Sequence, residues 1–422
     1  MIVGKLPNCY SRNTIIVFVF IITIGLIASI PTGHTSGDFD IYISASKNYL
    51  AKASIYTPHQ GIEEFKYLPF FALLFSPLAM CNKVFSLYLW GILNIALLYC
   101  MFYLLYKLKQ ISFNRFRDFF IIFCLFALTG RYIFSNIKVG QVNILLSSLL
   151  VLTIYFEIKK KPFLASIPLA LSLTIKLFPL LFLVYFVLRR RFKIVFFTFF
   201  LTLIFLLLPS VYSGFSLNLK YLQEWFDLIK STPANMLYSV KNYSLLSFFS
   251  WFFVVRHEPY FILDYRYITK GLPPEVYYAW LASCFLLFGS FFYDSLSKKN
   301  TENKVAYLDY SSLFVCMLLF NPLTYLNALV FLIIPCFFVL RALFYSVLSK
   351  RQIVLIGCFV VVSFIFSMAY NKIFFADIEQ FYQSLKFRFP MWAILSIYLS
   401  LWLVKATFKA KKTSVKSELL NE

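Results

Sequence analysis

Long apolar segments separated by short polar segments dominate the chain from end to end. Many of these segments hold about 17 to 25 residues, enough to cross a hydrocarbon core of ~30 Å as a helix. Twelve are predicted to be membrane helices: residues 14–30, 84–106, 118–135, 142–158, 163–175, 178–188, 192–210, 276–296, 305–320, 325–347, 353–370 and 390–408. The pattern therefore predicts an all-α polytopic membrane protein with about 12 transmembrane or re-entrant helices.

Some apolar segments do not fit a simple up-and-down series of spans. Residues 162–189 lie between two basic clusters that belong on one side of the membrane, yet Lys176 and Pro179 interrupt the apolar run. We expect a broken hairpin with Lys176 at its tip, because backbone freed at a break needs protein or water around it. Residues 68–80 and 238–255 are predicted to be re-entrant or interfacial, and residues 219–230 to form an amphipathic helix on the membrane surface.

Charge sets the orientation of this arrangement. The chain has 40 Lys and Arg against 18 Asp and Glu. Of these 40 cations, 23 fall on segments that the positive-inside rule places in the cytoplasm. The same rule places both termini in the cytoplasm. The outer loops are then residues 31–83, 211–275 and 371–389, which hold 11 of the 18 acidic residues. We expect one transmembrane domain over residues 1–408 and a basic cytoplasmic tail over 409–422.

Composition excludes several classes of protein. The chain is 61% hydrophobic and 14% charged, whereas soluble domains carry roughly 25% charged residues, so the net charge of +22 points to membrane lipids and not to nucleic acid. No CxxC or HExxH spacing is present, and no metal site or cofactor is predicted.

Two carboxylates, Asp38 and Asp40, follow closely on the first apolar segment. A carboxylate at an outer face is suited to remove a proton as a general base. The alternative is structural: Asp38 caps the N-terminus of a helix that begins there, and Asp40 lies in its first turn.

Lys176 is the second candidate for chemistry. Ionisable side chains at membrane depth are costly and are functional candidates, although a lysine can also extend to the interface. Arg131 either assists Lys176 with a phosphate group or extends to the interface in the same way.

Several short motifs then resemble, in order, those of one enzyme family. The motifs are GDFDIYISASKNYL at residues 37–50, FKYLPFFALLFSPLA at 65–79, GQVN at 140–143, IKLFP at 175–179, NYSL at 242–245 and NPLTYLN at 321–327. Together they resemble glycosyltransferase family 87, a member of the GT-C superfamily. One departure is that the family often has Trp and then His where this chain has Tyr325 and Asn327.

The resemblance implies a function. It implies an inverting hexosyltransferase, most simply a mannosyltransferase, that uses a polyprenyl-phosphate-sugar donor and a lipid or glycan acceptor at the outer face of a multi-pass protein of the cytoplasmic (inner) membrane. Asp38 matches the family's Asp-x-x-x-Tyr spacing and is the preferred catalytic base over Asp40, while Lys176, with Arg131, would bind the donor phosphate. Polar and aromatic residues of the motifs would bind substrate: Tyr42, Tyr67, Gln141, Asn143, Asn242, Tyr325 and Asn327.

Each of these assignments has an alternative. An aromatic belt at the membrane interface also explains the tyrosines, and hydrogen bonding between helices also explains Gln141 and Asn143. At the level of the whole protein, a 12-span secondary transporter or a ligase or polymerase of lipid-linked glycans would share the span count.

Overall fold

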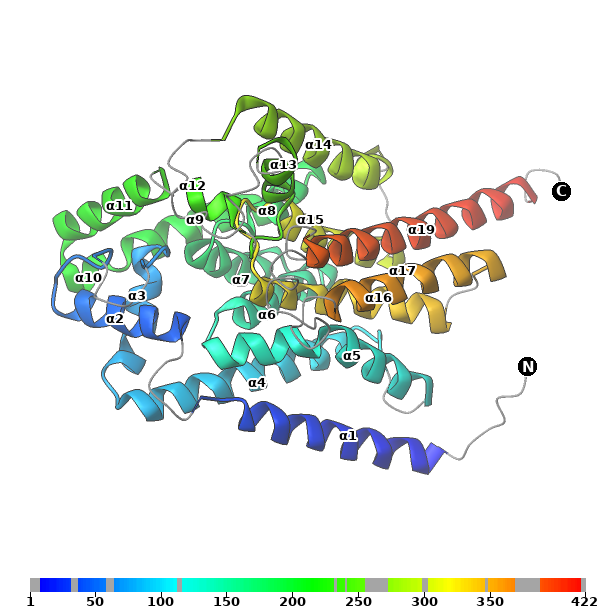
Figure 1. The fold of residues 1–422 in the computed structure, drawn as a ribbon, viewed down its shortest axis with the longest axis horizontal. Coiled ribbons are helices and arrows are strands. Elements are labelled where there is room, and N and C mark those ends of the chain that lie inside the picture. Colours follow the sequence, from blue (N-terminus) through cyan, green and yellow to red (C-terminus); the bar gives the residue numbers. More distant parts are fainter. Residues whose placement is uncertain are drawn as a thin grey trace. The chain divides into compact units, whose positions relative to one another are not determined.

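A computed structural model describes residues 8–31, 37–57, 64–111, 116–230, 234–239, 241–254, 272–297, 303–345, 348–368 and 388–418. Helices are the only regular elements in these residues (Figure 1). This agrees with the prediction of an all-α membrane protein, because a helix satisfies its own backbone hydrogen bonds where no water is present.

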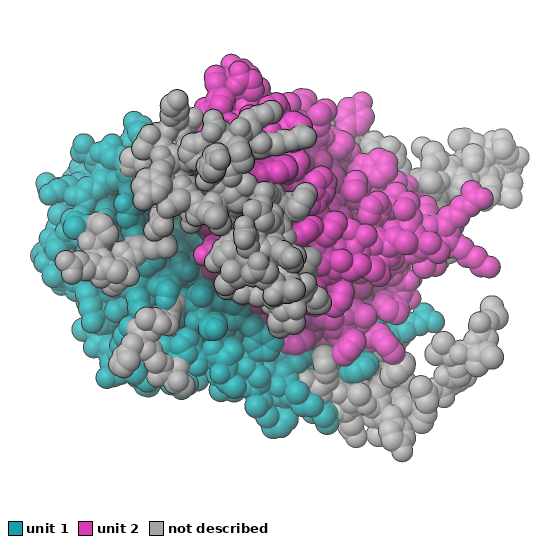
Figure 2. Space-filling model, in the orientation of Figure 1, with its two compact units in different colours: residues 1–119, 133–232 teal, residues 120–132, 233–422 magenta. Residues whose placement is uncertain are grey.

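The chain divides into two compact units, coloured separately in Figure 2. Unit 1 is residues 1–119 and 133–232, and unit 2 is residues 120–132 and 233–422. Helix α5 (Phe116–Val139) contributes residues to both units. The single domain predicted for residues 1–408 stays a prediction.

Unit 1 holds the first eleven helices apart from the middle of α5. They are α1 (Asn8–Ala28), α2 (Asp38–Leu50), α3 (Pro69–Ala79), α4 (Lys83–Lys107), α6 (Asn143–Ile158), α7 (Pro162–Ile175), α8 (Leu180–Leu188), α9 (Phe192–Leu207), α10 (Ser210–Ser213) and α11 (Phe215–Lys230). Within this unit α7 packs against both α6 and α9, and α2 packs against α3.

Unit 2 holds the remaining helices. They are α12 (Ala234–Tyr238), α13 (Leu245–Phe253), α14 (Pro274–Ser297), α15 (Asn303–Phe320), the 3₁₀ helix η4 (Leu326–Leu332), α16 (Ile333–Tyr345), α17 (Lys350–Met368) and α19 (Phe389–Glu418). Helix α19 packs against α15, α16 and α17. The buried carboxylate of Asp309 on α15 lies 2.7 Å from Lys405 Nζ on α19, so an ion pair offsets the cost of burying both charges.

Each segment predicted to be a membrane helix contains helix among its described residues, but the count of twelve spans is not confirmed. Seven helices among the described residues are long and apolar enough to cross a membrane. They are residues 83–107, 117–139, 192–213, 274–293, 326–345, 350–368 and 389–407. Helix α8 has 9 residues, and at 1.5 Å per residue it is too short to cross by itself.

The short segments also take helical form. The predicted re-entrant element at 68–80 is α3, which begins with Pro69 at its first position, where a proline's missing N–H costs nothing. The predicted amphipathic helix at 219–230 is part of α11, and the segment 238–255 contains α13. Their placement at a membrane surface stays a prediction.

The predicted break near Lys176 is present. Helix α7 ends at Ile175, Lys176 is extended at φ −141° and ψ 148°, and α8 begins after Pro179. Pro179 lacks an N–H donor and disfavours helical geometry in the residue before it, so the chain cannot continue α7 through this point. Lys176 is thereby held at the end of α7 and not within the helix.

Gly140, in the turn between α5 and α6, fixes the position of α2. Its φ of +68° is in the left-handed region, and a Cβ added to it would lie 2.6 Å from Cβ of Phe39 on α2. Its carbonyl oxygen accepts a 2.8 Å hydrogen bond from Trp90 Nε1 on α4. Only glycine has both the conformation and the missing side chain that this close approach requires.

We predict that Gly140→Ala lowers the stability of the protein by about 2 kcal/mol or more, because it adds left-handed strain and a clash with Phe39. Gly289→Ala, in α14, is the control: among the described residues, no atom outside the backbone of α14 lies within 4 Å of the added Cβ, and the change should be neutral or slightly stabilising in a helix. Thermal unfolding of both variants in detergent checks this. Equal midpoints for the Gly140 variant and the unsubstituted protein would contradict the close packing of α2.

Candidate functional site

Six of the predicted site residues come together in unit 1, although they are up to 138 positions apart in the sequence. We call them the Tyr67 cluster, and they are Asp38 and Tyr42 on α2, Tyr67 before α3, Gln141 and Asn143 at the start of α6, and Lys176 after α7. The turn at Gly140 and the break after Ile175 bring these segments together.

The Lys176 ammonium is held by two side-chain amides. Its Nζ donates to Asn143 Oδ1 at 2.9 Å and to Gln141 Oε1 at 3.4 Å, and it lies 5.3 Å from the centre of the Tyr67 ring. Burial lowers the pKa of Lys176 to about 8, and the neighbouring Asp38 carboxylate opposes that shift. The amide oxygens and the ring face are neutral partners of the ammonium, and Asp38 is the anionic group that acts on it.

Two buried tyrosines link the lysine to α2. The hydroxyl oxygens of Tyr42 and Tyr67 are 2.8 Å apart, and Tyr42 donates to Gln141 Oε1 at 3.1 Å. Their rings meet edge to face at 5.1 Å. Burial is the main cause that raises the pKa of both hydroxyls, and Asp38 adds to it, so both stay neutral hydrogen-bond donors at physiological pH.

The two carboxylates of α2 have different surroundings. Asp40 Oδ1 forms an ion pair with Lys83 Nζ at 2.8 Å, which ties α2 to the start of α4. Asp38 is partly buried and interacts electrostatically with Tyr42, Tyr67 and Lys176. Asp38 therefore belongs to the Tyr67 cluster, while Asp40 has a structural partner.

One local prediction about Asp38 is wrong. Gly37, with φ 64°, occupies the N-cap position of α2, and Asp38 is the first residue of the helix. A carboxylate there still interacts favourably with the N-terminal end of the helix dipole. Asp40 lies in the first turn, as predicted.

Arg131 belongs to unit 2, where it contacts α17. Its Nη1 donates to the carbonyl oxygen of Ser367 at 2.7 Å, and the adjacent Tyr132 hydroxyl donates to Ser367 Oγ at 2.6 Å. These bonds hold α5 to the end of α17. The predicted assistance of Arg131 to Lys176 stays a prediction.

The motif residues of unit 2 join two loops. The buried Asn242 side chain donates to the carbonyl oxygen of Pro322 at 2.7 Å and accepts from the N–H groups of Ser244 at 3.2 Å and Thr324 at 3.0 Å. These bonds stabilise the backbone of the loop that precedes Tyr325. Tyr325 is 37% exposed and Asn327 is partly buried, and substrate binding by all three predicted residues is not tested by these contacts.

Arg388 is a buried cation that the sequence analysis did not single out. It is 1% exposed, and its Nη2 donates to the carbonyl oxygens of Tyr238 at 3.3 Å and Ser247 at 3.5 Å. Its Nε and Nη1 have no hydrogen-bond partner among the residues that the structure describes. The signal in the sequence was an arginine directly before an apolar helix, on a segment predicted to lie at the outer face.

Comparison with known proteins supports an enzyme. The model of glycosyltransferase family 87 matches residues 65–322, while no curated protein and no solved structure matches the chain. The matched region includes Tyr67, Gln141, Asn143 and Lys176. Asp38 precedes it, and its charge acts on Tyr67 and Lys176. Since the match extends over more than half of a chain rich in membrane-spanning helices, the protein belongs to glycosyltransferase family 87, a family of membrane glycosyltransferases.

Proposed function

We propose that the protein transfers a hexose, with mannose as the first candidate, from a polyprenyl-phosphate-linked donor to a lipid or glycan acceptor at the outer face of the cytoplasmic membrane. The observation that carries the proposal is the Tyr67 cluster, in which Asp38 and Lys176 share one polar site within an apolar unit. The family match favours this reaction over the transporter that the span count also allowed.

The two charged groups of the cluster match the two charges that the reaction develops. The acceptor hydroxyl oxygen bonds to the anomeric carbon of the sugar, and the bond from that carbon to the phosphate oxygen breaks with its electron pair leaving on the phosphate. The transition state has oxocarbenium character, and Asp38 takes the proton of the acceptor hydroxyl as general base. Lys176 stabilises the charge that gathers on the departing phosphate.

The neutral members of the cluster position these groups. Gln141 and Asn143 hold the ammonium by two oxygens, and they can exchange those contacts for sugar or phosphate oxygens when the donor enters. Attack of the acceptor hydroxyl from the side opposite the phosphate inverts the anomeric configuration. Asp38 and Lys176 come from different segments, so the base and the phosphate-binding cation can lie on opposite sides of the sugar, as this attack requires. An acceptor hydroxyl would approach from the α2 side of the cluster.

The reaction itself is tested by incubating purified protein with polyprenyl-phosphate-mannose, polyprenyl-phosphate-glucose or GDP-mannose, together with membrane lipid extract. We expect a glycosylated product, identified by mass spectrometry, only with a polyprenyl-phosphate donor. Transfer from the nucleotide donor alone would contradict the proposed donor class.

Asp38→Asn keeps the size of the side chain and removes the base, so we predict that transfer falls by about 10²–10⁴-fold. Asp40→Asn is the matched control on the same helix. It breaks a surface ion pair worth less than about 1 kcal/mol and should leave turnover within about fivefold of the unsubstituted enzyme. Near-normal turnover of the Asp38 variant would rule out Asp38 as the base.

Lys176→Met keeps an apolar stem and removes the charge, so we expect weaker donor binding and transfer slowed by about 10²-fold or more. Lys176→Arg should retain part of the activity because the charge remains while its geometry changes. Lys83→Met, which removes the cation paired with Asp40, is the control and should have little effect on donor dependence. Unchanged kinetics in the Lys176→Met variant would remove this residue from the mechanism.

The pH dependence gives an independent test of Lys176. The ammonium is the charged form below its pKa of about 8, so kcat/KM for the donor should fall as the pH rises through that value. Arginine stays charged throughout this range, and the Lys176→Arg variant should therefore lose this descending limb. If kcat/KM of the arginine variant falls with pH as it does in the unsubstituted enzyme, another group causes the fall.

Orientation is tested by thiol labelling in a cysteine-free variant. A cysteine placed at Lys220, on α11, should react with an impermeant reagent in intact cells, whereas a cysteine at Lys109 should react only after lysis. The reverse pattern would place the Tyr67 cluster at the cytoplasmic face.

A further inference from the structure

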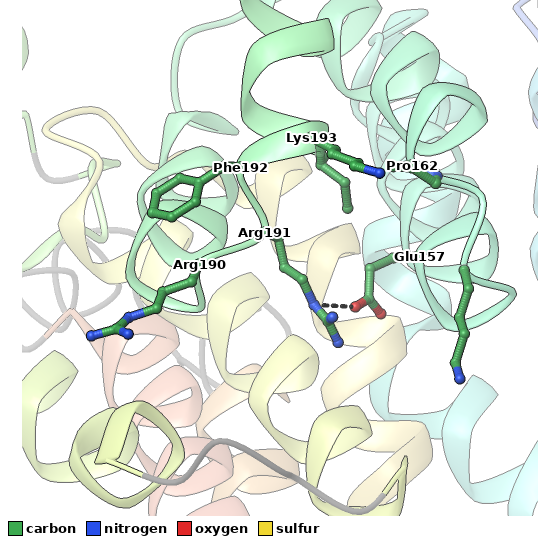
Figure 3. A pocket seen from close by; sticks show the side chains of 8 residues that line it. Glu157, Pro162, Arg190, Arg191, Phe192 and Lys193 are labelled. Atoms are coloured by element: carbon green, nitrogen blue, oxygen red, sulfur yellow. Dashed lines mark ion pairs between the residues drawn. The ribbon is translucent and has the colours of Figure 1, made fainter.

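A second polar region of unit 1 lies at the opposite end of α7 from Lys176. It is an open cavity of about 610 Å³ between the turn that joins α6 to α7 and the turn that joins α8 to α9 (Figure 3). The residues that line it are Glu157, Lys160, Pro162, Arg190, Arg191, Phe192, Lys193 and Ile194. At 1.5 Å per residue, the 14 residues of α7 separate it from Lys176 by about 20 Å, so it is distinct from the Tyr67 cluster.

The two turns have the same local structure. Lys160 and Arg190 have left-handed backbone, at φ 57° and φ 56°. Each of these residues follows the end of a helix. In the first turn the N–H of Lys161 donates to the carbonyl oxygen of Phe156 at 2.9 Å, and in the second the N–H of Arg191 donates to the carbonyl oxygen of Phe186 at 2.8 Å. Glycine normally occupies this position at a helix end, so two long cations line the cavity at positions where they add backbone strain.

The charge of the cavity is strongly positive. Arg191 Nε lies 3.1 Å from Glu157 Oε1 and pairs with it, and Figure 3 shows Lys193 directed towards Pro162 on the neighbouring helix. Within the part of the chain that the structure describes, no carboxylate pairs with Lys160, Arg190 or Lys193. Helices α7 and α9 also begin at this cavity, and their N-terminal dipoles add to its attraction for an anion.

The cavity adjoins an exposed apolar surface. Helix α9 begins at Phe192, within one of the candidate membrane spans. Phenylalanine side chains along one side of this helix are more than half exposed: Phe192, Phe196, Phe199 and Phe200. An exposed aromatic stripe that starts beside a basic cavity fits a molecule with an anionic head and apolar chains, and a free phosphate ion would use only half of this arrangement.

We propose that this cavity binds the phosphate headgroup of an anionic phospholipid, with its acyl chains along the exposed phenylalanines of α9. Lys160, Arg190 and Lys193 provide the charge, and Arg191 is held in place by Glu157. The site lies on the face that the distribution of Lys and Arg predicts to be cytoplasmic, where anionic lipid headgroups attract cations. This inference does not depend on the proposed sugar transfer.

The test compares the full-length protein with the double variant Lys160→Asn/Arg190→Asn in detergent. Asparagine tolerates left-handed backbone better than most residues, so the charges are removed with the turns retained. Lys109→Asn is the matched control, since Lys109 has the same left-handed backbone at φ 56° at the end of α4 but does not line the cavity. The readouts are the concentration dependence of thermal stabilisation and the lipid bound in native mass spectrometry, with palmitoyl-oleoyl-phosphatidylglycerol, palmitoyl-oleoyl-phosphatidylcholine and inorganic phosphate as probes.

We expect phosphatidylglycerol to bind the unsubstituted protein and the Lys109 variant, and the double variant to need about 10- to 30-fold more of it. The single variant Lys193→Gln, on regular helix, should weaken binding by about threefold to fivefold and gives the result if the double variant does not fold. Equal phosphatidylglycerol binding by all variants, or equal binding of phosphatidylcholine, would overturn the site. Stabilisation by inorganic phosphate at the same concentration as phosphatidylglycerol would overturn the assignment to a lipid.

Discussion

The ammonium of Lys176 is the group on which the arrangement of unit 1 depends. A lysine at the end of an apolar helix needs hydrogen-bond acceptors, because burying an unpaired cation is costly. Gln141 and Asn143 supply two oxygens at the start of α6, and Gln141 also accepts from Tyr42 and from the N–H of Val142. The side-chain oxygen of Gln141 thus joins α2, α6 and the break after α7. The polar cluster exists because these three segments meet at this oxygen.

The packing around that amide explains how the cluster is held in order. Gly140 lets α2 approach closely, and Trp90 fixes the carbonyl oxygen of the same glycine. Phe75 packs edge to face on both Trp90 and Phe39, so the apolar side of α2 is held by aromatic contacts. Asp38 and Tyr42, on this same helix, are therefore positioned by packing as well as by polar bonds.

Hydrophobic length predicted the helices well because membrane helices follow from one strong constraint, the satisfaction of backbone hydrogen bonds. The break at Lys176 followed from a proline and a charge in the same apolar run. The count of twelve spans was less secure, since α8 is apolar yet short and length alone does not show whether a helix crosses or enters and returns.

Contacts between distant segments were harder to predict than the helices. The motifs named Asp38, Tyr42, Tyr67, Gln141, Asn143 and Lys176. Contacts join the last five of these side chains, and the charge of Asp38 acts on three of them. Nothing in the sequence paired Asp40 with Lys83, because an ion pair between two helices depends on packing that spacing does not reveal. The N-cap of α2 was misassigned for a related reason: Asp is a common cap, but Gly37 occupies the N-cap position and the helix begins at Asp38. Arg388 escaped notice because its burial is visible only in three dimensions.

The central claim is that the Tyr67 cluster receives the phosphate end of a lipid-linked sugar, and photo-crosslinking tests it most directly. The probe is a polyprenyl-phosphate-sugar analogue with a diazirine on the isoprene unit next to the phosphate, and the labelled peptides are identified by mass spectrometry. The account predicts label within residues 64–72, 139–144 and 175–180, lost when unmodified donor is added in excess. Competed label confined to other segments, such as the loops around Asn242 and Tyr325, would contradict it.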